Sequence, residues 1–307
     1  YDHSNNPNQI STTTLLKPIR SIVLARQHKD LDKGGDVSSL IPSRIGVALH
    51  TSIENSWLSN KAKLNLVLKS LGYTDNVIQS IRINPVESEL SNDIIPVYLE
   101  KRSQKQIGKY LISGKFDFVI EGQVNDFKST ATYGYISGSN TDDYILQGSI
   151  YRWLNPTIIT DDNMKIQYIF TDWSKQKAIQ DKTYPQSRIL EKTYALMSLV
   201  ETENFLNRKI NEIENLETKP QSELPLCTRE QLWQTADVHK YYKNPQKLAR
   251  STKNYDVLSE ARQRQFDDGG VGTIITYNGQ VKRCAYCDVV GICDQANQLI
   301  KQGLLVL

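Results

Sequence analysis

Cysteine is scarce in this chain: only four cysteines occur among 307 residues, and none lies in the first 226. This absence excludes a disulfide framework over most of the chain. No uninterrupted apolar run approaches the roughly 20 residues that a membrane-spanning helix needs. The first residues, YDHSNNPNQISTTT, lack the apolar centre of a signal peptide. We therefore expect a reducing, cytoplasmic compartment and no membrane association. Because the chain begins at Tyr1 without Met, we expect part of a native N-terminus to be missing.

A strong excess of one charge is also absent. The chain has 37 Lys and Arg against 34 Asp and Glu, which leaves a net charge of +3. Such a balance neither requires nor excludes a nucleic-acid partner, so any basic surface must be local. The length suffices for one large domain, or for a core domain with a smaller appended lobe.

Hydrophobic periodicity predicts a helix at residues 43–58, because Ile45, Leu49, Ile53 and Trp57 recur every four residues. Similar patterns predict helices at 61–72, 142–154 and 198–217, and strands within 93–130 and at 164–173. This order indicates an α/β fold with a mixed sheet flanked by helices. Residues 218–225, TKPQSELP, have the composition of a linker. We therefore divide the chain into a core at 1–217 and a cysteine-containing lobe at 218–307.

The stretch GKFDFVIEGQVNDFKST, residues 114–130, is typical of a β-hairpin, yet it carries two aspartates and a lysine. A two-residue turn at its Glu-Gly dipeptide places Asp117 directly opposite Asp126. Asp126 and Lys128 then share one face, and Phe127 points to the other. Opposed carboxylates repel, unless a divalent cation lies between them. The alternatives are an exposed face with solvated charges, or a one-residue slip in register that separates the aspartates.

Three further residues can approach this hairpin. His50 lies beside the apolar stripe of the first predicted helix, at the border of the core, where a lone histidine is more often structural than a ligand. Gln147 and Tyr151 lie one turn apart on a later helix and project together. As a pair they carry little weight, because a tyrosine at that spacing is usually a core residue.

In chain order these residues resemble the RecB-type branch of the PD-(D/E)XK nucleases. The matching elements are the histidine of GVALH, the aspartate of GKFD, the D-x-K of DFK and the Q-x-x-x-Y of QGSIY. The D-x-K triplet alone occurs by chance, whereas all the elements in this order are far more specific. The resemblance covers roughly residues 40–155. It implies a restriction-endonuclease-like core and metal-dependent cleavage of DNA, with Asp126 standing where many members carry Glu.

The resemblance assigns a role to each of these residues. It implies that Mg²⁺ or Mn²⁺ is bound by His50, Asp117, Asp126 and the main-chain carbonyl of Phe127. Carboxylates and carbonyls suit a hard cation, and a histidine ligand shifts the preference toward Mn²⁺. It also implies that Lys128 orients or helps to deprotonate the attacking water, while Gln147 and Tyr151 support the active site and the DNA strand. Glu54 and Glu100 are candidate accessory carboxylates, which we interpret as surface or helix-packing residues.

The four cysteines predict a metal or cluster site. Cys284, Cys287 and Cys293 form a C-x2-C-x5-C run in CAYCDVVGIC, and Cys227 lies upstream. Four thiolates suit either a tetrahedral zinc or an iron–sulfur cluster, and the spacing does not choose between them. RecB-type nucleases with an iron–sulfur staple, such as CRISPR-adaptation nucleases and AddB-like subunits, end in the same run. The resemblance therefore implies a structural [4Fe–4S] cluster, with zinc as the alternative. In those proteins the distant cysteine precedes the nuclease core, whereas Cys227 follows it.

Between the cysteines, HKYYKNPQKLARSTKNY interleaves cations with tyrosines and contains no acidic residue. The cations are Lys240, Lys243, Lys247, Arg250 and Lys253. Phosphate-contacting cations beside stacking rings are typical of a single-strand groove, although a solvated face explains such a run equally well. Arg262 and Arg264 of EARQRQF add to the same pattern.

We interpret the chain as a metal-dependent DNA exonuclease that acts on DNA ends or single strands in recombination, repair or phage DNA metabolism. Its expected partners are DNA and a helicase or recombinase. The stretch PLCTREQLW and the C-terminal cysteines look similar to those of stand-alone phage-encoded members, which would place the protein in the host cytoplasm. Three alternatives remain: a flap- or junction-cutting endonuclease, a catalytically silent DNA-binding module, and a zinc recognition module formed by the cysteine lobe.

Overall fold

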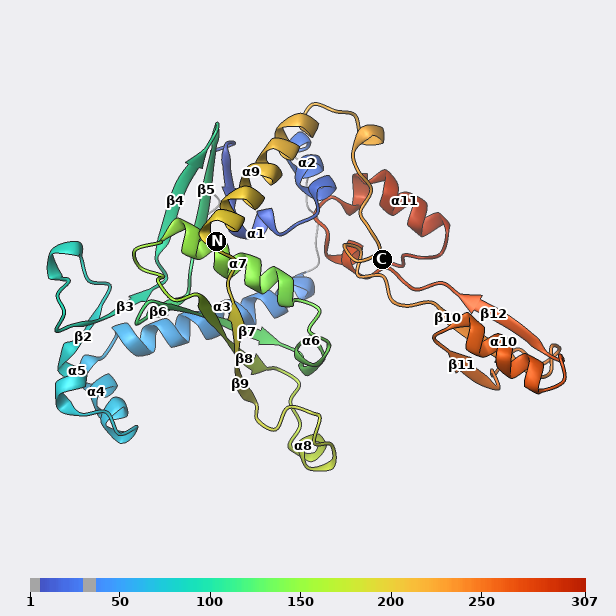
Figure 1. The fold of residues 1–307 in the computed structure, drawn as a ribbon, viewed down its shortest axis with the longest axis horizontal. Helices are drawn as coiled ribbons and strands as arrows, with labels where there is room; N and C mark the ends of the chain where they lie inside the picture. Colours follow the sequence, from blue (N-terminus) through green and yellow to red (C-terminus); the bar gives the residue numbers. More distant parts are fainter. Residues whose placement is uncertain (1–5, 30–36) are drawn as a thin grey trace. The chain divides into compact units, whose positions relative to one another are not determined.

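The computed structural model describes residues 6–29 and 37–307. The chain divides into two compact units (Figure 1). The first unit consists of Tyr1–Lys17 and Gly34–Asn211, and the second consists of Pro18–Lys33 and Glu212–Leu307. The division inferred from sequence lies after residue 217 and keeps the whole N-terminal region with the core. In the structure, the segment Pro18–Lys33 instead belongs to the same compact unit as the C-terminal part of the chain.

The first unit is built on a six-stranded mixed sheet. In spatial order its strands are β2 (Ile81–Ile83), β3 (Ile95–Leu99), β6 (Phe118–Ile120), β7 (Gln123–Thr130), β8 (Asn163–Phe170) and β9 (Ile189–Ala195). Strand β2 is parallel to β3 and β7 is parallel to β8, whereas the other neighbours are antiparallel. The prediction of an α/β fold with a mixed sheet and flanking helices is confirmed at this level.

A smaller sheet and several helices complete the unit. The sheet has the order β1 (Gln9–Ser11), β5 (Tyr110–Lys115) and β4 (Arg102–Ile107). The helices are α1 (Thr12–Leu15), α3 (Val37–Leu58), α4 (Lys61–Ser70), α5 (Asp75–Ser80), α6 (Thr132–Ser137), α7 (Thr141–Leu154), α8 (Lys175–Gln180) and α9 (Leu199–Leu216). A single 3₁₀ turn, η1 (Glu87–Glu89), precedes β3.

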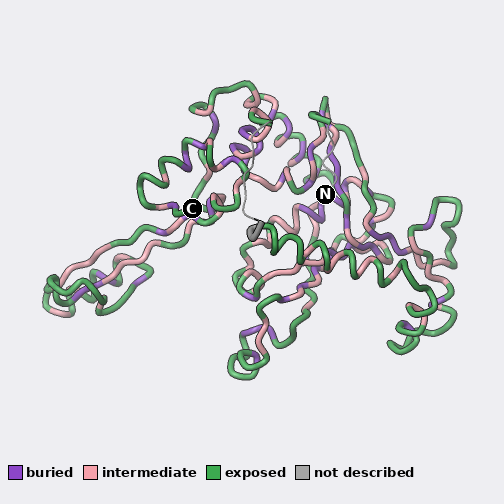
Figure 2. Tube along the Cα trace, turned by 180° about the vertical axis from the view of Figure 1, so that it is seen from behind, coloured by how far each residue is buried: buried purple, intermediate pink, exposed green. Residues whose placement is uncertain are grey.

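The two faces of the central sheet pack against different helices. Val124 of β7 lies in a buried cluster with Tyr151 of α7. Phe127, three residues later in the same strand, packs against the cluster of Val97, Leu99 and Phe118 on the other face, which Trp57 of α3 also contacts. Figure 2 shows buried residues concentrated along the central strands and α7, while α3 and α4 are mostly exposed or half-buried. The sheet therefore holds α3 and α7 on opposite sides of the hairpin strands.

Most predicted elements of this unit are present with shifted ends. Helix α3 begins at Val37 and continues through Pro42, six residues before its predicted start. Its apolar stripe is only partly covered, since Ile45 remains 47% exposed. Helix α9 begins with a capping box: the Ser198 amide donates to Glu201 Oε2 at 2.8 Å, and the Glu201 amide donates to Ser198 Oγ at 3.1 Å.

The second unit contains a three-stranded antiparallel sheet and several short helices and 3₁₀ turns. Its helices are α2 (Ile19–Gln27), α10 (Leu258–Asp267) and α11 (Asp294–Lys301). The sheet has the order β11 (Lys253–Tyr255), β10 (Val238–Tyr242) and β12 (Thr273–Tyr277). The 3₁₀ turns are η2 (Gln221–Glu223), η3 (Arg283–Tyr286) and η4 (Val290–Ile292). Across the described residues of both units, no helix has the length and apolar character needed to cross a bilayer.

The stretch interpreted as a linker, residues 218–225, is packed rather than free. The Gln221 side chain donates to the carbonyl of Ile292 at 3.0 Å and accepts from the amide of Asp294 at 2.6 Å. Leu224 is buried. The composition of this stretch reflects a 3₁₀ turn whose polar side chains bond to neighbouring backbone, so the linker interpretation is wrong.

Candidate functional site

The hairpin of β6 and β7 has the predicted register. Ile120 pairs with Gln123, and Phe118 pairs with Asn125. Glu121 and Gly122 have φ values of 49° and 78°. Positive φ at both central residues is the signature of a type I′ turn, whose twist matches that of the flanking strands. The prediction of a two-residue turn is therefore confirmed.

Asp117 immediately precedes β6 and lies across from β7. Its Oδ2 accepts a hydrogen bond from the Phe127 amide at 3.0 Å. His50 of α3 contacts the same place from the helix: its Nε2 lies 2.9 Å from the Phe127 carbonyl oxygen, and its Nδ1 lies 3.4 Å from Asp117 Oδ1. The interaction with Asp117 raises the pKa of His50, although burial opposes this. The structure thus brings together three of the four groups that were predicted to hold a metal.

Glu100 is the residue that sequence reasoning undervalued. One ligand atom from each of His50, Glu100 and Asp117 lies within 4.8 Å of the other two, so this group could hold a metal ion. Glu100 has a φ of 49°, and its amide donates to the Asp117 carbonyl at 2.9 Å. Burial raises the pKa of Glu100, and an ion pair with Lys115 opposes that rise. This geometry supports the interpretation of Glu100 as an accessory carboxylate over that of a surface or packing residue.

The backbone conformation of Glu100 is unusual for a residue other than glycine. A positive φ costs free energy at a residue that carries a side chain, and residues in this conformation cluster at functional sites. This conformation places Glu100 directly after the buried end of β3, where its carboxylate reaches Asp117. One imidazole nitrogen and two carboxylates form a donor set suited to a divalent cation such as Mn²⁺ or Mg²⁺.

Asp126 and Lys128 form a separate ion pair beside this group. Asp126 is 1% exposed, and its Oδ2 lies 2.6 Å from Lys128 Nζ. The same buried oxygen has no partner with the angles of a hydrogen bond. Burial raises the pKa of Asp126, the charge of Lys128 opposes that rise and the charge of Asp117 adds to it, and the net result is a pKa of about 6. Burial alone would lower the pKa of Lys128, but Asp126 and Asp117 outweigh it and leave that pKa raised.

Gln147 and Tyr151 of α7 extend the pair into a buried polar chain. Lys128 Nζ donates to Gln147 Oε1 at 3.0 Å, and Gln147 Nε2 donates to Tyr151 Oη at 2.8 Å. Both α7 side chains are buried, and burial holds the pKa of Tyr151 well above its ordinary value. The ammonium of Lys128 also lies 5.3 Å from the ring centroid of Tyr144. The amide of Gln147 therefore fixes the position of the lysine.

The predicted site residues consequently form two neighbouring groups. His50, Asp117 and the carbonyl of Phe127 lie together with Glu100. Asp126, Lys128, Gln147 and Tyr151 follow one another in ionic and hydrogen-bonded contact. The two groups interact electrostatically, because the charge of Asp117 acts on both Asp126 and Lys128.

The four cysteines of the second unit line one small cavity of about 30 Å³. The sulfurs of Cys227, Cys284, Cys287 and Cys293 form no disulfide. Burial raises the pKa of Cys284 to about 11, and the neighbouring cysteines add to that rise. Four cysteine sulfurs around one cavity, which a bound metal would hold in the thiolate form, are the donor set of a thiolate-bound metal centre, so these residues fit such a group.

The spacing of the sulfurs bears on the size of that group. A tetrahedral zinc with Zn–S bonds near 2.3 Å sets its sulfurs about 3.8 Å apart. Among the residues that the structure describes, no three cysteine sulfurs lie within 4.8 Å of one another. Four cysteine sulfurs suit either a zinc ion or a [4Fe–4S] cluster.

The basic, tyrosine-rich stretch between the cysteines folds into β10, β11 and the loop between them. Lys240 and Lys253 lie over tyrosine rings, 4.4 Å from the centroid of Tyr277 and 4.9 Å from that of Tyr255. Lys243 lies 3.4 Å from Asp268. Arg264 is likewise paired with Asp268, at 3.1 Å. Several of these cations therefore have partners within the unit, and the stretch is not one continuous free basic surface.

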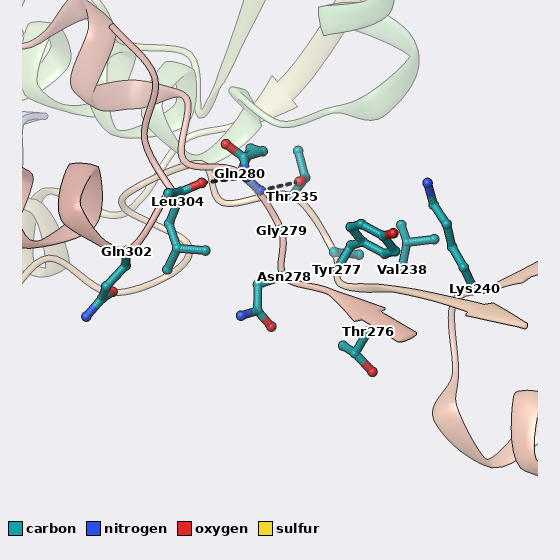
Figure 3. A pocket seen from close by; sticks show the side chains of 12 residues that line it. Thr235, Val238, Lys240, Thr276, Tyr277, Asn278, Gly279, Gln280, Gln302 and Leu304 are labelled. Atoms are coloured by element: carbon teal, nitrogen blue, oxygen red, sulfur yellow. Dashed lines mark hydrogen bonds between the residues drawn. The ribbon is translucent and has the colours of Figure 1, made fainter. Parts of the chain in front are cut away.

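An open pocket of about 500 Å³ adjoins this sheet (Figure 3). Lys240 and Tyr277 line it from the strands, and Gln302 and Leu304 line it from the C-terminal segment. Gly279 is required beside it, because an added Cβ would lie 1.7 Å from the Thr235 carbonyl oxygen. No carboxylate, cysteine or histidine is among the residues that line this pocket.

Comparison with known proteins adds little to this geometry. No protein-family model matches the chain, and no curated protein matches its sequence. A crystal structure of SSO0001 aligns with 20% identity and a TM-score of 0.41, over 72% of this chain and 81% of the other. A phage-related exonuclease from Haemophilus somnus 129PT aligns with 14% identity and a TM-score of 0.25, over 38% of this chain and 59% of the other. Both TM-scores lie below 0.5, so the description of the site stands on its own residues.

Proposed function

We propose that this chain is a divalent-metal-dependent deoxyribonuclease with a restriction-endonuclease-like core, and that it acts as an exonuclease on DNA ends or single strands. The observation that carries the proposal is the β6–β7 hairpin. It sets Asp117, Asp126 and Lys128 beside His50 of α3 and Gln147 of α7, which are distant from it in sequence. These residues were named from the sequence through the resemblance to RecB-type nucleases, and their meeting at one place supports the proposal.

The residues divide the chemistry between them. His50, Asp117 and Glu100 would hold the cation together with Asp126 and the Phe127 carbonyl. When bound, Mg²⁺ or Mn²⁺ supplies charge neutralisation at the phosphate and lowers the pKa of a coordinated water. Lys128, held by Gln147, presents a positive charge beside the carboxylates and orients the water or the phosphate. Tyr151 fixes Gln147 through its hydroxyl.

The second unit would serve as a structural lobe of the same enzyme. Four cysteines around one cavity support a thiolate-bound centre, and the resemblance to cluster-carrying RecB-type nucleases makes a [4Fe–4S] cluster our proposal, with zinc as the alternative. A cluster would give a brown protein whose absorbance near 400 nm bleaches with dithionite. A colourless protein that is purified without oxygen and carries zinc would refute the cluster and leave the nuclease assignment intact.

The assignment is tested with end-labelled linear DNA, single- and double-stranded, beside closed circular DNA, in Mg²⁺ or Mn²⁺. We expect metal-dependent cleavage that spares circles. We expect Asp117→Asn to reduce the rate by at least roughly 100-fold, because it weakens the site of the cation that neutralises the phosphate and leaves the shape of the side chain unchanged. Lys128→Ala should have a comparable effect. Lys165→Met is the matched control, since Lys165 of the adjacent strand pairs with Glu191 outside the site.

Each other result has a defined meaning. Nicking of closed circles would replace the exonuclease with a structure-specific endonuclease. Metal-dependent cleavage retained by both Asp117→Asn and Lys128→Ala, with unchanged melting transitions, would overturn the site. DNA binding without turnover in any metal, in protein whose cysteine centre is loaded, would indicate a silent binding module or an enzyme that requires a helicase or recombinase partner.

A further inference from the structure

Helix α2 contributes a buried arginine to the second unit. Arg20 is 3% exposed. Its Nη1 donates to the carbonyls of Leu224 at 3.1 Å and Gln221 at 3.2 Å, and its Nη2 donates to Gln221 Oε1 at 3.0 Å. None of these acceptors carries a charge. A buried guanidinium is costly unless an anion balances it, so this arrangement leaves the charge of Arg20 to be explained.

The remaining N–H of the guanidinium points to a cysteine. Arg20 Nε donates to Cys293 Sγ at 3.4 Å, and Arg20 lines the cavity that all four cysteines share. No carboxylate is paired with Arg20 in the part of the chain that the structure describes. The sulfurs are thus the groups that can supply the missing negative charge.

A loaded cysteine centre would supply it. Four thiolates carry more negative charge than either a zinc ion or a [4Fe–4S] core carries positive charge, so the centre stays anionic with either metal. Hydrogen bonds to the sulfurs and nearby charge are the means by which a protein tunes such centres. The side chain of Arg20 supplies both the hydrogen bond to a sulfur and the nearby positive charge.

We propose that Arg20 is the counter-ion and N–H···S donor of the cysteine centre, so that helix α2 is a working part of that centre. This inference rests on the four-cysteine centre suggested above. It means that the centre is completed by an N-terminal helix that supplies an arginine rather than a ligand. The same guanidinium ties the centre to residues 221–224, the segment that leads to Cys227.

The test compares the full-length wild type with Arg20→Met, Arg20→Lys and Arg26→Met, all purified without oxygen. Arg26→Met is the matched control, because Arg26 lies on the same helix but pairs with Glu217, at 2.7 Å. Three quantities are measured: metal per chain, the rate of metal loss to a chelator, and the melting temperature before and after metal removal. For an iron–sulfur cluster the reduction potential is added.

We expect Arg20→Met to lose metal about 10- to 100-fold faster than wild type, the range typical for partners that support metal ligands. The rise in melting temperature on loading should shrink in Arg20→Met and persist in Arg26→Met. Arg20→Lys keeps the charge but lacks the planar guanidinium, so its rate of metal loss should lie between those of wild type and Arg20→Met. The reduction potential of a cluster should fall when the positive charge is removed.

The opposite results are equally clear. A purely structural arginine would lower the melting temperatures of the loaded and metal-free proteins by equal amounts and leave the rate of metal loss unchanged, which would overturn the proposal. If Arg20→Met does not fold, Arg20→Lys decides, and a wild-type rate of metal loss in that variant is the overturning result. Wild-type protein that binds no metal after anaerobic reconstitution would refute the cysteine centre itself, whereas a loaded wild type with an unaffected Arg20→Met refutes only the role of Arg20.

Discussion

Asp126 has the most unusual environment among the residues of the candidate site. Its carboxylate is buried beside Asp117 and is balanced by one ammonium, that of Lys128. Burying a carboxylate costs free energy that the pairing offsets only in part, so its pKa rises to about 6. The metal-free protein is thus ready to take up a proton just below neutrality.

This raised pKa predicts a pH dependence of metal binding. Below pH about 6, folded Asp126 holds a proton that an ordinary aspartate, with a pKa of 3.8, would not hold. A cation must displace that proton, and it also needs His50 in its neutral form, whose pKa is raised. The affinity for Mg²⁺ or Mn²⁺ should therefore fall as His50 gains its proton, and fall by a further factor of about ten per pH unit below pH about 6. Titration calorimetry from pH 5 to 7.5 measures the effect. In Asp126→Asn the bend near pH 6 should vanish, and a bend that persists would assign the proton to another group.

A second residue-scale prediction concerns the hairpin turn. Glu121 is exposed and has a φ of 49°, a conformation that costs an L-residue free energy. Asparagine tolerates that conformation and is favoured before glycine in a type I′ turn. Glu121→Asn should therefore raise the free energy of unfolding by about 0.5–1 kcal/mol, as measured by urea denaturation. Glu121→Gln removes the charge but keeps the strain, so it should give no comparable gain.

At the scale of elements, the sequence predicted the features that depend on neighbouring residues in the chain, such as turns, strand register and helix caps. The register of β6 and β7 follows from a two-residue turn and strict alternation of faces, both readable over 17 residues of sequence, 114–130. The cap of α9 follows from Ser198 and Glu201 alone. The order of these elements was enough to predict a mixed sheet with helices on both faces.

Other features could not be predicted because they depend on distant contacts. Glu100 belongs to the candidate metal-binding group only because β3 lies beside β6, which brings its carboxylate to Asp117. A positive φ at a glutamate leaves no trace in composition or periodicity. Arg20 shows no signal at all in the sequence, since its partners lie some 200 residues further along the chain. Residues 218–225 looked like a linker because polar turn residues and linker residues have the same composition.

At the scale of the whole molecule, two separate sets of contacts predict two unfolding transitions. Each compact unit has its own core, with the larger one around the central sheet and a small one around Tyr241. Mg²⁺ at 100 times its Kd should stabilise the first unit by about 2.7 kcal/mol. Metal removal from the cysteines should lower the transition of the second unit.

Differential scanning calorimetry separates these effects. Asp117→Asn should abolish the shift produced by Mg²⁺ and leave the shift produced by removing the cysteine-bound metal. A single transition that moves as a whole with either treatment would mean that the two units unfold cooperatively, against this prediction.

The placement of α2 also constrains how the protein is made. During synthesis the N-terminal helix leaves the ribosome long before its partners in the second unit, because Gly34–Asn211 must be translated first. At about 5–20 residues per second this interval lasts roughly 10–35 s. Throughout it, Arg20 has neither its carbonyl acceptors nor the sulfur of Cys293. A cysteine centre that includes Arg20 can therefore form only after Cys293 has been translated, and a chain that ends before that residue would leave α2 without these partners.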